Sequence, residues 1–357
     1  MKLKLLKGRY MKFKTAINMK SNIATAAAIT MVGLLSTSCG GGGGGEAVPT
    51  VNTPATVTYT GATTPAAITV GNTNNLSAGV AGGNQSTGLL IGAVPVSSGS
   101  KPPVEASGKL KKLATALIRT GIQTPSVAAG AVQQMNQTYA CPLSGTQSFV
   151  GQVDTVALTA TATISFNNCT ELNGSVANGS AVVNMTMDQV TLNPLTMNMS
   201  FNAMSMSDPQ LGGITMTGSI AVATSYATNT DTATINLATQ DLITGRQNKM
   251  QNMMMISQFD IYNAPTTVSD SMSGRFFDSV HGYVDVQTIT PLFQNLADAY
   301  PLSGQLILTG GNLVAGATKV RLTALSATQV LLEGDTTGDG NYDYSSGAMA
   351  WTALQTL

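Results

Sequence analysis

The sequence predicts a mainly β protein, an antiparallel meander of about ten strands that forms a curved sheet, a sandwich or a half-barrel. Three observations lead to this prediction. Long stretches after Cys141 alternate apolar and polar residues with a period of two, most clearly in residues 156–166. Thr is frequent in these stretches, and Gly and Asn separate them. Alternation with one polar face is typical of antiparallel sheets that face water on one side.

The strand candidates follow one another along the chain. The same alternation occurs in residues 183–187, 195–201, 214–222, 232–237, 253–262, 276–289, 305–308, 320–325 and 329–332. A short motif, an apolar residue followed by Ser, Thr or Asn and then Gly, recurs at residues 143–145, 172–174, 216–218, 272–274 and 302–304. Its irregular spacing argues against a solenoid and favours hairpins in a meander.

The chain divides into four regions. Residues 1–38 are predicted to be a signal peptide, and residues 39–103 a flexible tether rich in Gly, Thr and Pro, largely disordered because it buries too little. Residues 104–137 predict one or two short helices, since Leu110, Leu113 and Leu117 share a helical face. Residues 138–357 are predicted to form the β-domain.

Charge differs between the leader and the rest of the chain. Seven Lys or Arg and no acidic residue precede Cys39, which leaves ten basic against seventeen acidic residues after it, a net charge near −7. The charges are scattered singly, so nucleic acid is not an expected partner. One His and few Glu leave little material for acid–base catalysis, and we expect the protein not to be an enzyme.

An apolar run, residues 23–35, follows the basic leader and is too short for a comfortable membrane span. It leads into Leu-Leu-Ser-Thr-Ser-Cys at residues 34–39, which resembles the lipobox of bacterial lipoproteins, with Ser36 where that pattern usually has Leu. The resemblance implies that Cys39 carries acyl chains and that the lipid bilayer is a partner. Gly40 at the second mature position implies the outer membrane. An ordinary secretory signal is the alternative.

The chain has three Cys. With Cys39 assigned to lipid, Cys141 and Cys169 remain, and an oxidising compartment favours one disulfide between them. Two free thiols or a metal pair are the alternatives, but no CxxC motif or nearby His supports a metal pair.

The chain has 18 Met, several of them in Met-x-Met pairs. In a strand, both members of such a pair point to one face. The paired residues are Met185, Met187, Met197, Met199, Met204 and Met206. Packing in a β-core is the favoured interpretation, because Met fills irregular space well. A hydrophobic-ligand pocket and a Cu(I) site are the alternatives.

Residues 335–343 look like a degenerate calcium loop. Oxygen-bearing side chains stand at alternate positions, and the candidate ligands are Asp335, Thr337, Asp339, Asn341 and Asp343. Ser346 occupies the place where such loops carry Glu. A hairpin turn made by Asp-Gly is the favoured interpretation. The cofactor prediction is therefore none, with weak Ca²⁺ binding as the alternative.

His281 lies near Asp278, Ser279 and Asp285. A Ser-His-Asp arrangement is one interpretation, but the sequence has no G-x-S-x-G nucleophile elbow. We expect this histidine to be incidental.

Residues from about 140 to 357 resemble uncharacterised proteobacterial lipoproteins with a β-rich C-terminal domain. The resemblance is carried by Cys-Pro at 141–142, Phe-Asn-Asn-Cys at 166–169, Tyr-Pro at 300–301, residues 320–325, residues 335–340 and Trp351 to Leu354. It implies the same anchored architecture and no particular activity.

The expected function is therefore that of a membrane-anchored envelope lipoprotein. Its β-domain is expected to be non-catalytic, with a structural, adhesive or binding role and an envelope protein as partner. A carrier of a hydrophobic ligand or Cu(I) on the Met-rich face is the alternative.

Overall fold

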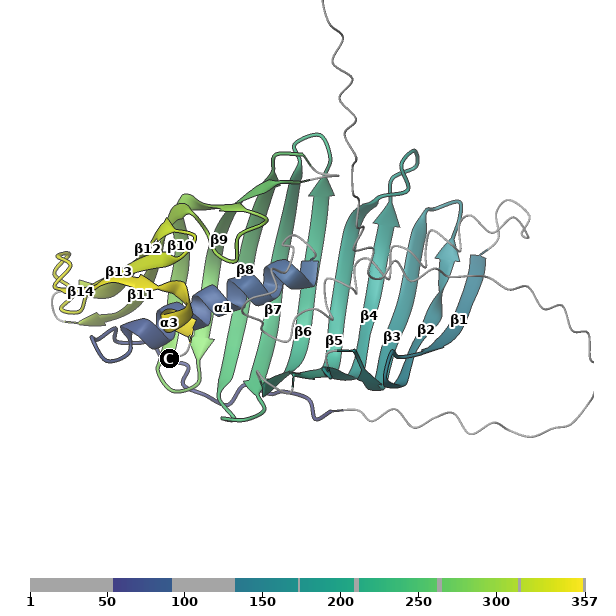
Figure 1. Cartoon of the computed structure of the whole chain (residues 1–357), viewed down its shortest axis with the longest axis horizontal. Coiled ribbons are helices and arrows are strands. Elements are labelled where there is room, and N and C mark those ends of the chain that lie inside the picture. The colour runs from purple at the N-terminus through teal and green to yellow at the C-terminus, as the bar shows by residue number, and fades with distance from the viewer. Residues whose placement is uncertain are drawn as a thin grey trace, which may run out of the picture. The chain divides into compact units, whose positions relative to one another are not determined.

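The computed structural model describes residues 54–91, 132–172, 174–208, 212–261, 265–313 and 316–355. All of them belong to one compact unit, Thr50–Leu357. Fourteen antiparallel strands form one sheet in which every strand lies beside its neighbours in sequence (Figure 1). The strands at the two ends of the sheet, β1 and β14, do not pair with each other.

The strands are long for a globular protein and are joined by short connections. They are β1 (Val132–Ala140), β2 (Ser144–Asp154), β3 (Thr159–Thr170), β4 (Val176–Met187), β5 (Pro194–Asp208), β6 (Gly212–Ser225), β7 (Thr230–Asp241), β8 (Gln247–Phe259), β9 (Thr267–Asp278), β10 (Gly282–Asn295), β11 (Ser303–Leu313), β12 (Gly316–Ser326), β13 (Gln329–Asp335) and β14 (Tyr344–Ala350).

The prediction of a mainly β antiparallel meander is confirmed, but the strand number and the finer architecture differ. Fourteen strands replace about ten, and they form a single open sheet. Strands β1, β2 and β14 were missed because their sequences are rich in Gln, Ser and Gly and give little alternation. Residues 276–289, expected as one strand, span the turn between β9 and β10.

The two edges formed by the hairpin turns need separate names. Because the strands are antiparallel, odd-numbered strands all end at one edge of the sheet, at the bottom in Figure 1. We call it the strap edge, because the first part of a segment that we call the strap (residues 54–72) runs along it. Even-numbered strands end at the opposite edge, called the far edge.

Period-two alternation places one face of the sheet in the core. In β3 and β4 buried residues alternate with more exposed ones, as the sequence predicts. The buried residues of β1 to β13 join one hydrophobic cluster with the helices. We call this buried side the inner face.

The strap, residues 54–72, pairs with successive strands through its backbone. The Val57 amide donates to Thr217 Oγ1 of β6 (2.9 Å), and the Thr60 amide donates to Gln247 Oε1 of β8 (2.8 Å). Further along, the Ala66 amide donates to the Tyr283 carbonyl (2.8 Å) and the Gly311 amide to the Ala66 carbonyl (2.6 Å). The strap therefore crosses the strap-edge ends of several strands.

The strap leads into helix α1 (Thr73–Ile91), which crosses the inner face (Figure 1). Asn72 orders the chain just before the helix: its Oδ1 accepts from the Thr69 amide (2.8 Å), and its side-chain amide donates to the Ala67 carbonyl (2.9 Å). Leu76 and Val80, one turn apart, are buried in the core. Gly79 allows the backbone of α1 to lie close to Phe276 of β9, since a Cβ at this position would be 2.6 Å from Phe276 Cζ.

The tether prediction therefore differs from the structure over residues 54–91, which form the strap and α1. Gly-rich sequence gives this helix little intrinsic stability. Burial of Ala66, Ile68 and Leu76 in the core stabilises the strap and the helix, which their composition alone would not do. The remainder of the predicted tether lies outside the described residues.

The prediction of short helices over residues 104–137 is wrong for residues 132–137, which belong to β1. Pairing with β2 extends over the whole strand, from Val132 opposite Asp154 to Ala140 opposite Thr146. Such long-range pairing overrides a weak helical pattern. Residues 104–131 lie outside the described residues.

The last described element is helix α3 (Trp351–Gln355). Its Trp351 stacks on Tyr300, with ring centroids 5.5 Å apart.

Candidate functional site

The predicted methionine site lies on the inner face of β4 and β5. Met185 stands directly opposite Met197, and Met199 lies between Val183 and Ile220 of the neighbouring strands. The six predicted residues are buried, with exposed fractions of 2% (Met185), 4% (Met187), 1% (Met197), 0% (Met199), 0% (Met204) and 2% (Met206).

Their surroundings are those of a packed core. The six belong to the same hydrophobic cluster as Phe201, Ile220 and Leu237. Met250, Met253, Met255 and Met272 continue the methionine surface across β8 and β9. The inner face therefore brings the six predicted methionines together in the hydrophobic core, each at most 4% exposed.

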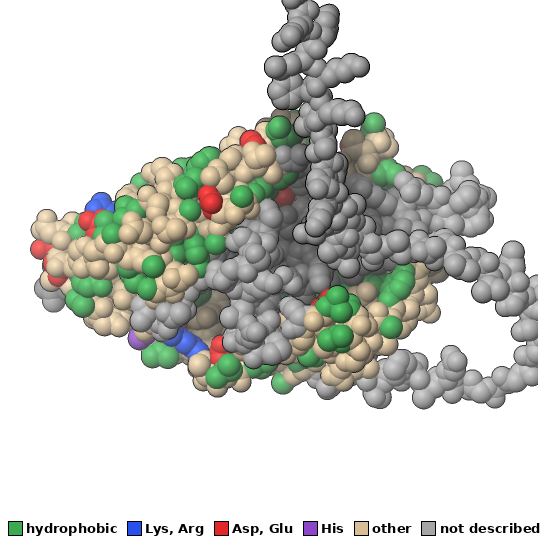
Figure 2. All heavy atoms as spheres, viewed as in Figure 1, with side chains coloured by type: hydrophobic (Ala, Val, Ile, Leu, Met, Phe, Trp, Pro, Cys, Tyr) green, Lys and Arg blue, Asp and Glu red, His purple; other side chains and the backbone are tan. Residues whose placement is uncertain are grey.

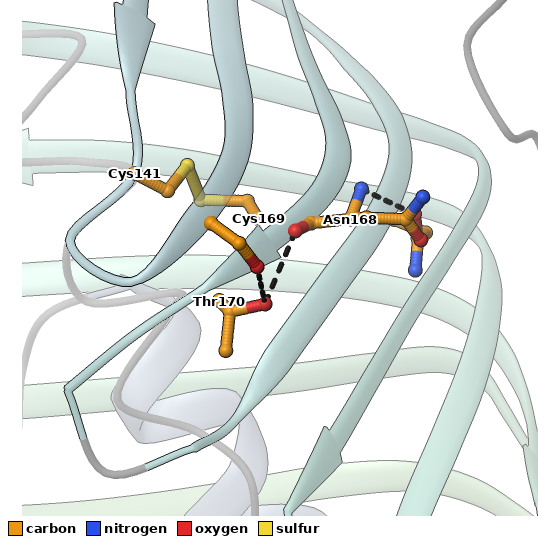
Figure 3. The surroundings of a disulfide bond; sticks show 6 residues. Cys141, Asn168, Cys169 and Thr170 are labelled. Atoms are coloured by element: carbon orange, nitrogen blue, oxygen red, sulfur yellow. Dashed lines mark hydrogen bonds between the residues drawn. A yellow bond between two sulfur atoms is a disulfide. The ribbon is translucent and has the colours of Figure 1, made fainter.

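Cys141 and Cys169 form a disulfide, with their Cα atoms 5.3 Å apart (Figure 3). Cys141 follows β1 and Cys169 lies in β3, so the bond spans β2. A bulge in β3 brings the second cysteine into place: Asn168 has φ 47°, and its amide donates to Asn178 Oδ1 (2.7 Å). The predicted pairing is confirmed.

Gly145 faces this bulge from β2. Its φ is +79°, and a Cβ there would lie 2.0 Å from the Asn168 carbonyl oxygen. Ser144 Oγ donates to Thr170 Oγ1 (2.8 Å), and Thr170 Oγ1 donates to the Asn168 carbonyl (3.2 Å; Figure 3). The disulfide, the bulge and these hydrogen bonds fix the first turn of the strap edge.

The predicted calcium loop is the turn between β13 and β14. Both carboxylate oxygens of Asp335 accept backbone amides, from Gly338 (2.7 Å) and Gly340 (2.9 Å). Asp343 accepts the Thr336 amide (2.7 Å), and the Thr336 hydroxyl holds the pKa of Asp343 below its usual value. The loop satisfies these carboxylates internally, which favours the turn interpretation.

Asp339 serves the same turn. Its Oδ1 accepts the Asn341 amide (2.8 Å), and this hydrogen bond holds the pKa of Asp339 below its usual value. Asn341 also donates its side-chain amide to Asp339 (3.2 Å). Thr337, the fifth candidate ligand, lies in the turn as well. Among the described residues, no group of three or more His, Cys, Asp or Glu side chains is placed to hold a metal ion.

His281 lies in the turn between β9 and β10. Its backbone amide donates to Asp278 Oδ1 (3.0 Å), which also accepts the Val280 amide (2.9 Å). The other Asp278 oxygen pairs with Arg246 at 2.6 Å. Asp278 therefore shapes the turn and neutralises an arginine, and its oxygens are not directed at the imidazole.

A repeated turn was missed in the sequence. Four hairpins share the pattern Asp-x-Val/Ile-x-Leu/Gly, and they begin at Asp154, Asp188, Asp241 and Asp278. In each, one aspartate oxygen accepts the amides two and three residues later, at 2.6 to 3.1 Å. The fifth residue has positive φ. This is the Asx-turn chemistry of short loops.

The third residue of each repeat is an exposed aliphatic. Val156 and Val190 lie at the far edge, with exposed fractions of 66% and 89%, and Ile243 and Val280 lie at the strap edge, with 76% and 67%. The turn geometry does not require an apolar side chain at this position, because the side chain points into solvent. Aligning the four aspartates in the sequence would have revealed the pattern.

A buried polar row crosses the inner face close to the far edge. Asp231 of β7, Ser257 of β8 and Asp270 of β9 stand opposite one another in register. Asp231 accepts the Thr224 hydroxyl (2.7 Å), whereas Ser257 Oγ and Asp270 Oδ1 have no hydrogen-bond partner. Burial raises the pKa of Asp270 to about 6, and the Ser257 hydroxyl on the adjacent strand lowers it in part.

An open depression of about 520 Å³ lies at the strap edge. It is lined by Pro54 and Ala55 of the strap, by Ser205 and Thr215, and by residues 240–245 at the β7–β8 turn. Its lining offers one carboxylate, Asp241, whose Oδ1 already accepts the Ile243 and Thr244 amides. The depression therefore presents an apolar and hydroxyl surface.

None of the described helices is long and apolar enough to cross a membrane. No protein-family model matches the chain, and no curated protein or solved structure is significantly similar to it.

Proposed function

We propose that the protein is a lipid-anchored lipoprotein of the bacterial envelope whose β-domain has a non-catalytic structural, adhesive or binding role. The anchor is the acylated Cys39, and Gly40 directs the chain to the outer membrane. The partners are the bilayer and a further envelope protein. The proposal begins from the lipobox-like residues 34–39.

The observation that carries the proposal is the position of the strap. Pro54, its first described residue, lies at the strap edge, fifteen residues beyond Cys39. Fifteen residues reach at most about 50 Å when fully extended. An anchor at Cys39 would therefore hold the domain close to the membrane, and the attachment would act on one edge of the sheet.

The use of polar groups supports a non-catalytic role. The aspartates at the hairpin turns accept backbone amides, as Asp154 and Asp188 do. His281 contributes a backbone amide to its turn. The disulfide supports an oxidising compartment, as expected for an exported chain.

The carrier alternative receives no support from the methionine face. A ligand or Cu(I) would need access to thioethers that are at most 4% exposed in Met185, Met187, Met197 and Met199. Titration of the purified protein with Cu(I) at micromolar concentration is expected to show no binding. Stoichiometric binding that is lost in Met185→Leu/Met197→Leu would revive the carrier hypothesis.

Lipidation is tested by intact mass. The chain isolated from a bacterial envelope is expected to begin at Cys39 and to carry the mass of the acyl chains. Cys39→Ala should lose that mass and leave the membrane fraction. Cys141→Ala/Cys169→Ala, which leaves Cys39 in place, is the control and should still be acylated. A mature chain without added mass at Cys39 would overturn the proposal.

A further inference from the structure

Exposed aliphatic side chains mark the turns of the strap edge. Each of the four described turns between β1 and β10 at this edge carries one, whereas the β5–β6 connection at 209–211 lies outside the described residues. The four are Leu143, Leu172, Ile243 and Val280, with exposed fractions of 58%, 69%, 76% and 67%. Figure 2 shows hydrophobic side chains reaching the surface along the lower rim.

These side chains form a row. Neighbouring strands lie about 4.8 Å apart, so successive turns at one edge are separated by roughly 10 Å and the row extends for roughly 40 Å. Leu242, at 52% exposed, lies beside Ile243 and widens the row at its middle. An apolar row of this length on one edge suits a planar apolar partner better than a small ligand.

Cations of the described residues gather at the same edge. Arg246, Lys249 and Arg275 lie within three residues of strap-edge strand ends, and Lys319 and Arg321 lie near the start of β12. Three of the five are paired with carboxylates: Arg246 with Asp278, Arg275 with Asp285 and Arg321 with Glu333. The acidic turn from β13 to β14 also lies at this edge, beyond the row of aliphatic tips.

The far edge offers a contrast. Val156, Val190 and Ile261 are exposed there too, but no Lys or Arg accompanies them in the described far-edge turns. Acidic residues accompany the exposed aliphatic side chains at both edges: Asp154, Asp188 and Asp260 at the far edge, and Glu171, Asp241 and Asp278 at the strap edge. Within the described residues, the two edges therefore differ in their cations and not in their carboxylates.

We propose that the strap edge is a membrane-docking edge, whose aliphatic turn tips insert into the interface of the bilayer that anchors Cys39. This inference rests on the proposed anchoring. The first described residues of the strap lie at this same edge, where Pro54 and Ala55 line the depression together with Ile243. The anchor therefore presents the strap edge to lipid first, and insertion of the tips holds the sheet edge-on with the far edge directed away.

The test measures which edge contacts lipid. A chain beginning at Cys39 keeps the whole compact unit, Thr50–Leu357, and has one free thiol because Cys141 and Cys169 are paired. Coupling Cys39 to a maleimide phospholipid in phosphatidylethanolamine–phosphatidylglycerol vesicles supplies the anchor whatever the cell does to this cysteine. A failure of docking is thereby distinguished from a failure of lipidation, which intact mass reports.

Tryptophan introduced at the turn tips reports depth through quenching by lipids brominated on their acyl chains. Ile243→Trp and Leu172→Trp probe the strap edge, and Val190→Trp, in the same type of turn as Ile243, is the matched far-edge control. The native Trp351 is 3% exposed and supplies a constant baseline. Strap-edge tryptophans are expected to be quenched several times more than Val190→Trp. Equal quenching at the two edges, or none at either, would overturn the proposal.

A second variant set guards against a perturbation caused by tryptophan itself. Leu172→Asp/Val280→Asp is expected to raise the exposure of the anchored domain to an added protease, because the edge no longer inserts. Val156→Asp/Val190→Asp should leave proteolysis unchanged. Circular dichroism of both variants checks that the sheet is retained. A reversed order of the two variants would contradict docking through the strap edge.

Discussion

The two halves of the inner face are built from different side chains. The methionine half, on β4 to β8, is lined by Met185, Met197, Met199, Met204 and Met255. The aliphatic half, on β10 to β13, is lined by branched residues: Val284, Val286, Leu306, Leu308, Val320, Leu322, Val330 and Leu332. Helix α1 contacts β12 and β13 of this half, together with β9 and α3.

One sheet therefore combines two kinds of core. Branched aliphatic side chains have few rotamers and pack specifically against rigid helices. Methionine is unbranched and adapts to irregular space. The methionine half is continuous with strands joined by the Cys141–Cys169 disulfide, whereas the aliphatic half is fixed by α1, α3 and the Trp351–Tyr300 stack.

Leu322→Ala should be the most damaging single change. Leu322 is fully buried between Leu306 and Leu332 of the adjacent strands. Truncation leaves a cavity in a well-packed region and is expected to lower the free energy of unfolding by about 2 to 5 kcal/mol. Urea denaturation measures the change. Leu325→Ala, at an exposed position of the same strand, is the control and should cost less than about 0.5 kcal/mol.

Loss of the disulfide should destabilise the other end of the sheet. The bond closes a loop with a sequence separation of 28, so Cys141→Ala/Cys169→Ala is expected to lose roughly 3 to 4 kcal/mol on the chain-entropy model. Hydrogen exchange should show faster opening of β1 to β3 than of β10 to β13. Uniform acceleration throughout the sheet would show that the two halves unfold as one cooperative unit.

Asp270 should make stability fall as pH rises. Its pKa in the folded state, about 6, is above the usual value for aspartate, so the folded state binds the proton more tightly. The stabilising contribution is complete below about pH 4 and is lost as pH rises through 6. Asp270→Asn is expected to remove this dependence and to raise stability at pH 7 by about 1 to 3 kcal/mol.

The exposed aspartate Asp188 provides the control for this prediction. Hydrogen bonds from Thr191 and Val190 lower its pKa, so its contribution is present above about pH 4 and is lost as pH falls. Asp188→Asn should therefore leave the pH 4 to 6 range unchanged. Thermal unfolding as a function of pH distinguishes the two residues. Equal pH profiles for the wild-type chain and Asp270→Asn would contradict the assignment.

The smallest expected effect concerns exchange between the two core types. Met199→Leu should cost less than about 1.5 kcal/mol, because the volumes are similar and neighbouring methionines can adjust. Leu322→Met should cost more than Met199→Leu, because rigid branched neighbours surround the flexible side chain. Denaturation midpoints of the two variants make the comparison. The reverse order would mean that the methionine half is the more specifically packed one.

Much of the sheet could be predicted locally. Alternation in residues 156–166 and 195–201 correctly placed the apolar side chains of β3 and β5 on the buried face. Polar strands such as β1 escaped prediction because their pairing partner, not their own pattern, makes them strands. The burial of Asp270 could not be predicted either, since it depends on register across three strands.

The row of aliphatic tips at the strap edge could also be predicted only in part. Every aspartate of the repeated turn and every aliphatic tip can be read from the sequence, but the edge to which each belongs follows from the number of strands. An error from about ten to fourteen strands changes which turns lie together. Leu143, Leu172, Ile243 and Val280 become a row only when the meander is complete.

The local chemistry of this protein can be predicted from its residues alone: the alternating faces, the turn formers, the cysteine pair and the lipobox-like residues before Cys39. Most of these features depend on a few neighbouring residues, and the cysteine pairing has few alternatives because the chain has three Cys. The course of the strap depends on tertiary contacts, since Val57 meets Thr217 across 160 residues of sequence. The stability of the Gly-rich helix depends on them too, because burial of Leu76 and Val80 offsets its poor propensity.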